Sequence, residues 1–180
     1  MLSLQTLDTQ RLLRFNAQVL DQALRLIAAH GGAGAPPYAT PVGAHLRHVI
    51  EHYEALLFAA HDGTLNYDQR PRSRALETDA ALAQRRVQAL QCHLALWSGP
   101  QLATPIRVRG IGGVAGDFEF AVMSTLAREL VFLASHALHH FALLQAHCEM
   151  HGIALDATFG RAPSTVAHDR AHDIELTHTP

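Results

Sequence analysis

Near the N-terminus, apolar side chains recur at helical spacing. From Leu4 to Ala29 they fall every three or four residues, which places them along one side of a helix. Gly31 and Gly32 follow directly and favour a helix end. The pattern therefore predicts a first helix over Leu4 to Ala29, whose buried side is formed by Leu7, Leu12, Leu13, Phe15, Val19, Leu20, Ala23, Leu24 and Ile27.

The same spacing predicts two further helices in the first hundred residues. One runs from Pro41 to Ala60, because Thr40 is a good N-cap residue and proline suits the first helical position. The other begins after Thr78-Asp79 and ends at Gly99-Pro100. Residues 64–77 between them are polar, rich in arginine and without periodicity, which predicts a long crossover loop.

The second half of the chain predicts a β-hairpin followed by a long last helix. Residues 106–109 and 118–122 alternate between apolar and polar side chains and are separated by glycines, a pattern typical of a hairpin. No Gly or Pro interrupts the chain from 117 to 151, and Ser124 or Thr125 provides a cap for a helix in this run.

Four amphipathic helices indicate an all-α fold, a four-helix bundle with a long crossover loop and a small β-hairpin before the last helix. A chain of 180 residues suits one domain, which we place at residues 1–160, followed by an irregular C-terminal tail at 161–180. The first and third helices carry apolar residues beyond a narrow stripe, for example Phe15 beside Leu12 and Leu13. Such surplus surface predicts a homodimer, and the alternative is that the crossover loop and the hairpin cover it.

Charge and hydropathy narrow the expected partners and location. The formal net charge is −2, so we expect no nucleic-acid and no membrane-surface partner. The N-terminus lacks the pattern of a secretory signal, and no apolar run reaches about 18 residues. We therefore expect a cytoplasmic protein that acts on a small molecule.

Histidine is the compositional outlier, with 14 residues in the chain. On the last helix His136 and His140 lie about 40° apart on one face, one turn from each other, so both imidazoles can bind one metal ion. His139 points about 100° away from His140. Imidazole-only ligation fits zinc and nickel, and a three-imidazole site keeps a position open for water or a thiolate.

The third imidazole is expected from the second helix, which carries His45, His48 and His52 within about 60° of one another. Considered as a helical wheel, this segment slightly favours His45 and His52 as the inward-facing residues. Spacing alone leaves the choice among the three open.

The crossover loop supplies candidates for substrate binding. If it crosses the bundle end that holds His48, Tyr67 and Arg70 lie over the open metal position, where Tyr67 hydrogen-bonds a substrate and Arg70 pairs with its carboxylate. The competing interpretation pairs the arginines of this loop with Glu77 and Asp79 on the surface. On the last helix, Arg128 and Glu129 predict an ion pair, and Glu129 is also placed to orient a ligand histidine.

Two segments resemble the DinB/YfiT-like superfamily of metalloenzymes. Pro41-Val42-Gly43-Ala44-His45-Leu46-Arg47-His48 is similar to the family's second-helix segment, which ends in a metal histidine, and His136-Ala137-Leu138-His139-His140 is similar to its His-x-x-His-His segment. The resemblance covers roughly residues 5 to 152. The family often continues with Arg-Gly-Gln, where this chain has Phe141-Ala142-Leu143.

This resemblance implies a single DinB-like four-helix bundle whose metal ion is held by His48, His136 and His140. The helical wheel keeps His52 and His45 as alternates, and imidazole-only ligation favours zinc or nickel as the one divalent ion. The resemblance also implies a metal-dependent transferase that activates a low-molecular-weight thiol such as bacillithiol, mycothiol or glutathione. The alternative is a non-catalytic metal-containing binding or stress-response protein, because a fold does not determine an activity.

Overall fold

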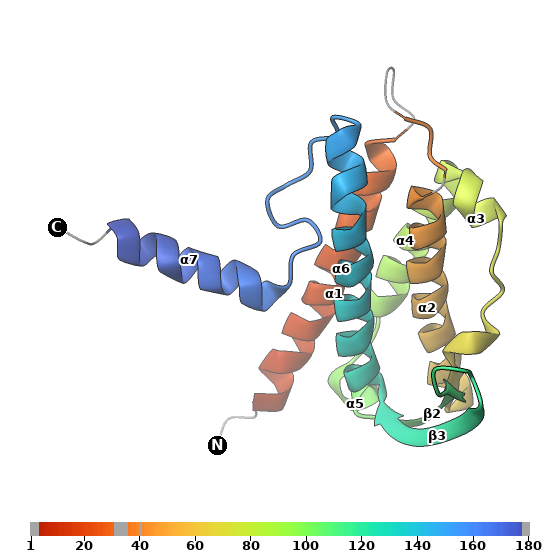
Figure 1. Cartoon of the computed structure of the whole chain (residues 1–180). Helices are drawn as coiled ribbons and strands as arrows, with labels where there is room; N and C mark the ends of the chain where they lie inside the picture. Colours follow the sequence, from red (N-terminus) through yellow and green to blue (C-terminus); the bar gives the residue numbers. More distant parts are fainter. Residues whose placement is uncertain (1–3, 31–35, 40, 178–180) are drawn as a thin grey trace.

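The computed structural model, which describes residues 4–30, 36–39 and 41–177, is mostly helical with a small three-stranded sheet at one end (Figure 1). Its long central helices pack in pairs, α1 against α4 and α6, and α2 against the same two. They are α1 (Leu4–Ala28), α2 (Val42–Asp62), α4 (Ala80–Ala95) and α6 (Leu126–Met150).

One apolar core lies among these helices. Each contributes fully buried leucines, among them Leu20, Leu46, Leu90 and Leu133, as the helical spacing in the sequence predicts. The additional apolar residues of α1, Leu12, Leu13 and Phe15, are half-buried and pack against this core. The protein itself thus covers part of the surface on which the homodimer prediction rests.

Local capping explains where several helices start and stop. Asp79 accepts a hydrogen bond from the Leu82 amide at the start of α4, and Thr125 accepts one from the Arg128 amide at the start of α6. Gly63 ends α2 in the left-handed conformation with φ of 70°. The predicted cap Thr40 and the predicted stop Gly31-Gly32 lie outside the described residues.

The crossover between α2 and α4 has regular structure, which corrects the prediction of a plain loop. It begins with β1 (Thr64–Asn66), continues through a 3-10 turn, η1 (Tyr67–Gln69), and ends in the short helix α3 (Ala75–Thr78). β1 pairs in parallel with β2 (Pro105–Gly112), and β2 pairs antiparallel with β3 (Phe118–Thr125), the predicted hairpin. A three-residue strand is too short to show a period, and its partner lies about forty residues further on.

Two segments for which the sequence predicted no helix of their own are helical in the structure. The third long helix stops at Ala95, and Gly99-Pro100 begins a separate turn, α5 (Gly99–Leu102), because proline fits a helix start. The tail expected to be irregular contains α7 (Pro163–Thr177), which extends away from the other helices (Figure 1). Its polar composition shows little amphipathic pattern. No helix in the described part of the chain is long and apolar enough to span a membrane.

Candidate metal centre

Three histidines from two neighbouring helices converge beside the crossover. His48 projects from α2, and His136 and His140 project from α6, which packs alongside it. One ligand atom from each lies within 4.8 Å of the others, and all three side chains are half-buried. The structure thus brings together the residues that the resemblance implies as metal ligands.

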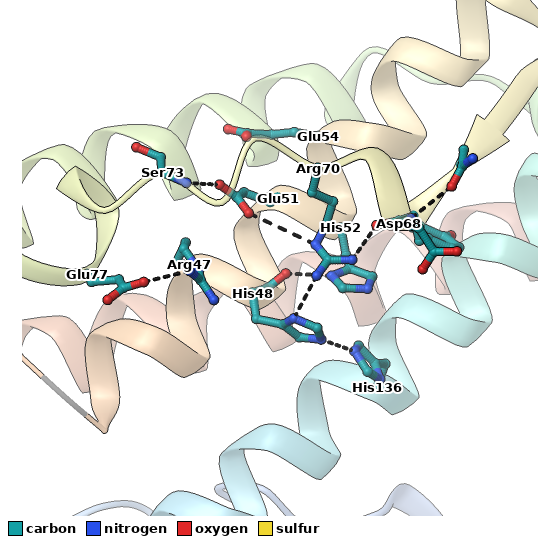
Figure 2. Close-up of polar contacts among 12 residues, drawn as sticks. Arg47, His48, Glu51, His52, Glu54, Asp68, Arg70, Ser73, Glu77 and His136 are labelled. Atoms are coloured by element: carbon teal, nitrogen blue, oxygen red, sulfur yellow. Dashed lines mark hydrogen bonds and ion pairs between the residues drawn. The ribbon is translucent and has the colours of Figure 1, made fainter. Parts of the chain in front are cut away.

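The donor set suits a divalent ion of the zinc type. The Nε2 atoms of His48 and His136 face each other at 2.8 Å (Figure 2), and the ring of His140 lies 4.5 Å from that of His48 between centroids. A tetrahedral ion with bonds of about 2.0–2.1 Å holds nitrogen ligands about 3.3 Å apart. The 2.8 Å between these two Nε2 atoms and the 4.8 Å limit on the ligand atoms of all three histidines lie on either side of this value, so side-chain adjustments would bring the three nitrogens to coordination distance.

The two alternate histidines lie next to this triad but outside it. His45 places Nδ1 2.7 Å from Nδ1 of His140, which leaves Nε2 of His140 for an ion. The buried His52 points Nδ1 at the carbonyl oxygen of His48 at 2.6 Å, and since a carbonyl only accepts, this nitrogen carries the proton. The ring of His52 packs against those of His48 and His136.

Burial among other imidazoles keeps these rings neutral. Desolvation, followed by the neighbouring histidines and Arg70, lowers the pKa of His48 to about 2. Desolvation is also the main cause that lowers the pKa of His52 to about 4 and that of His140 to about 4. Desolvation lowers the pKa of His136 as well. Neutral imidazole is the form that binds metal, so the cluster does not need to lose protons near neutral pH before it can act as a ligand set.

Arg70 reaches the triad from the crossover. Its Nη2 lies 3.3 Å from Nδ1 of His48 (Figure 2). Its Nη1 donates to the carbonyl oxygen of Tyr67. The competing surface interpretation of the loop is wrong for Arg70, because Glu77 pairs with Arg47 and Asp79 caps α4.

The contact between Arg70 and His48 has a consequence for metal binding. A guanidinium only donates, so Nδ1 of His48 accepts and the proton of this ring sits on Nε2. If Nε2 of His48 held a metal ion, the proton of this ring would sit on Nδ1, and the Arg70 guanidinium would turn away from that nitrogen. Glu51 is the acceptor at hand: its buried Oε2 has no hydrogen-bond partner in the described part of the chain and lies 4.0 Å from Nε of Arg70.

Tyr67 is held by a buried carboxylate. Its hydroxyl donates to Glu129 at 2.9 Å, and the same carboxylate accepts from Ser124 at 2.6 Å and from Arg128 at 2.8 Å. The predicted ion pair between Arg128 and Glu129 is therefore confirmed. Among the described residues, no ligand histidine hydrogen-bonds Glu129, whose oxygens accept from these three donors instead.

The ring of Tyr67 forms part of the wall of the histidine cluster. It stacks on His52 at 5.1 Å between centroids and contacts Phe132, which in turn stacks on His136. Because the Tyr67 hydroxyl points at Glu129, burial and this carboxylate raise its pKa well above the ordinary value. The structure thus places Tyr67 beside the site, with its hydroxyl turned toward Glu129 rather than toward the triad.

Sequence reasoning missed Glu51 as a neighbour of the site. It is 1% exposed, and its Oε1 accepts a hydrogen bond from the Ser73 amide at 2.7 Å, which ties the crossover to α2. The available signal was its position three residues after His48, on the same helix face.

Comparison with known proteins gives a partial likeness. No family model and no solved structure matches the chain. Among curated proteins, the chain is 33% identical over 104 residues to one named FK506-binding protein 5 from Rhizopus delemar. The match covers 58% of this chain, and the chain spans only 27% of the length of that relative. This is a local similarity between parts of two proteins.

Proposed function

We propose that the chain is a DinB-like four-helix bundle that binds one divalent metal ion, zinc or nickel, through His48, His136 and His140. We further propose that it transfers a low-molecular-weight thiol to a small-molecule substrate. The observation that carries the proposal is the convergence of three neutral imidazoles with a cationic side chain, Arg70, beside them.

The ligand set favours a reactive site over a purely structural one. Structural zinc sites are normally closed by four protein ligands, whereas three imidazoles keep one coordination position for a substrate. A divalent ion at this position lowers the pKa of a bound thiol, so that the thiolate nucleophile is available near neutral pH.

Arg70 supplies the positive charge needed for substrate recognition. It is tethered by the carbonyl of Tyr67 and faces His48, so its guanidinium lies at the edge of the triad. Low-molecular-weight thiols such as glutathione carry carboxylates, and a charge-assisted hydrogen bond to one of them contributes roughly 1.5–3 kcal/mol. The rings of Tyr67 and Phe132 pack against those of His52 and His136 and supply an apolar surface beside the triad.

Metal content tests the first half of the proposal. The protein purified without an affinity tag is expected to carry one divalent ion at this site, measured by elemental analysis, and His136→Ala to lose most of it. His139→Ala is the matched control, because His139 lies on the same helix turn but is exposed. Equal loss of metal in both variants would contradict the ligand assignment.

Thiol binding tests the second half. With metal content unchanged, Arg70→Ala should weaken thiol binding roughly tenfold or more, the equivalent of about 1.4 kcal/mol. Arg74→Ala is the control, since Arg74 belongs to the same loop but is exposed. A metal-loaded protein that neither binds nor conjugates any low-molecular-weight thiol would instead support a non-catalytic binding protein.

A further inference from the structure

A second group of histidines lies further along α6, away from the candidate metal centre. His147 follows His140 by seven residues, some 10 Å along the helix axis, too far to reach the same ion. Its ring stacks on that of His30, which follows α1, at 6.0 Å between centroids. The ring of His151, one turn further on, lies 4.3 Å from that of His147.

Two of these rings are already in the tautomer of a metal ligand. Nδ1 of His30 lies 2.7 Å from the carbonyl oxygen of Leu26, and Nδ1 of His151 lies 2.8 Å from that of His147. Because a carbonyl only accepts, both Nδ1 atoms carry the proton and both Nε2 atoms present a lone pair. A backbone carbonyl bound to the remote nitrogen is a common support of metal-bound histidine.

His30 has a nitrogen without a partner. Its side chain is 5% exposed, and its buried Nε2 makes no hydrogen bond to any part of the chain that the structure describes. A buried acceptor left without a partner costs about 1–3 kcal/mol, so such an atom calls for an explanation. A metal cation coordinated by the lone pair of this nitrogen would be such a partner.

We propose that His30, His147 and His151 form a second site for a borderline divalent cation of the zinc, nickel or copper class. The pair His147 and His151 has the same spacing as His136 and His140, and three nitrogen donors without thiolates select this class of metal. The ring of His147 must turn to close the site, since it lies parallel to that of His30 at 6.0 Å between centroids, further than the 4.5 to 5.0 Å between rings of the first centre. Its half-exposed side chain permits this movement.

An ion held by these residues would link the end of α1 to the end of α6. Both helices belong to the central core, so the proposed site is a stabilising clamp and contributes no residue to the thiol chemistry. Metal binding at this second site therefore does not depend on the proposed function.

Calorimetric titration with zinc tests the second site in the tag-free full-length chain, after a chelator has removed the ion that the protein is expected to carry when purified. His168, His172 and His178 are replaced by alanine in every variant, so that imidazoles near the C-terminus do not contribute. We expect two ions per chain in this background. His147→Ala should bind one ion, which His136→Ala then removes, whereas His136→Ala alone should retain the second ion.

Matched variants show whether zinc binding depends on these three histidines or only on how many histidines the chain contains. His93→Ala is the control, because His93 is exposed and its Nδ1 also lies against a backbone carbonyl, that of Ala89. It should leave both ions bound, while His151→Ala should weaken the second ion by at least about tenfold, the lower end of the loss seen when only a supporting residue of a metal ligand is removed. Two ions bound with unchanged affinity in both His147→Ala and His151→Ala would overturn the proposal, as would a single ion per chain that His136→Ala abolishes.

Discussion

Glu129 offers the sharpest test of how the crossover is attached to the helices. Its carboxylate is 1% exposed and accepts from the Tyr67 hydroxyl, the Ser124 hydroxyl and the Arg128 guanidinium. Glu129→Ala removes the acceptor and leaves the two hydroxyls without it. The Arg128 side chain is 66% exposed, so water replaces the lost carboxylate around its guanidinium. The loss of this ion pair therefore contributes under about 1 kcal/mol to the destabilisation.

The two hydroxyls determine the magnitude. Hydrogen bonds to a charged group contribute about 1.5–3 kcal/mol each, so we expect Glu129→Ala to lower the free energy of unfolding by roughly 3–6 kcal/mol. Glu129→Gln keeps the size of the side chain and one acceptor oxygen, so it should lower the free energy of unfolding by less. Urea unfolding followed by circular dichroism gives both values, because the slope and midpoint report the free energy directly.

A double-mutant cycle isolates the contact with Tyr67. Tyr67→Phe should cost roughly 1.5–3 kcal/mol in the wild-type chain and close to nothing in Glu129→Ala, where its partner is already gone. Tyr38→Phe is the control, since the Tyr38 hydroxyl donates to the carbonyl of Leu76 and shares no partner with Glu129. A cost of Tyr67→Phe that is the same in both backgrounds, within about 0.5 kcal/mol, would refute the assigned network.

Three further predictions concern pH, packing and association. In protein stripped of metal, the pKa of His52 is lowered to about 4 in the folded chain, below its value of about 6.5 in the unfolded chain. The unfolded chain therefore binds more protons between these two values. As a result, stability that is present at pH 7 is lost as the pH falls from 6.5 toward 4. His52→Gln should flatten this slope in urea unfolding at pH 7, 6 and 5, and an unchanged slope would contradict the assignment. A Cβ on Gly43 would lie 1.9 Å from the backbone oxygen of Glu77, so Gly43→Ala should lower the free energy of unfolding by about 3 kcal/mol. Gly63→Ala should cost less, roughly 1–2 kcal/mol, because there the left-handed backbone is the only source of strain. The reverse ranking in urea unfolding would refute this packing. The homodimer stays a prediction, which light scattering at micromolar concentration decides by giving either twice the chain mass or the monomer mass.

Local features of the sequence determined the helices and much of the metal centre. The spacing of leucines, the caps Asp79 and Thr125 and the alternation around the hairpin are properties of a few neighbouring residues, so they can be recognised without a partner. The pairing of His136 with His140 is of this kind, because both lie on one helix and the geometry of that helix alone sets their separation.

Tertiary packing decided which residues face each other. His45, His48 and His52 differ by less in rotation than the uncertainty of a helix boundary, and the packing of α2 on α6 is what brings His48 into the triad and leaves the other two beside it. The contact of Arg70 with His48 depends on the path of the crossover, which the pairing of β1 with a strand formed much later in the chain helps to set. The stacking of His30 on His147 joins residues more than a hundred positions apart, and no local pattern records such a contact because it exists only once both helices have packed on the common core.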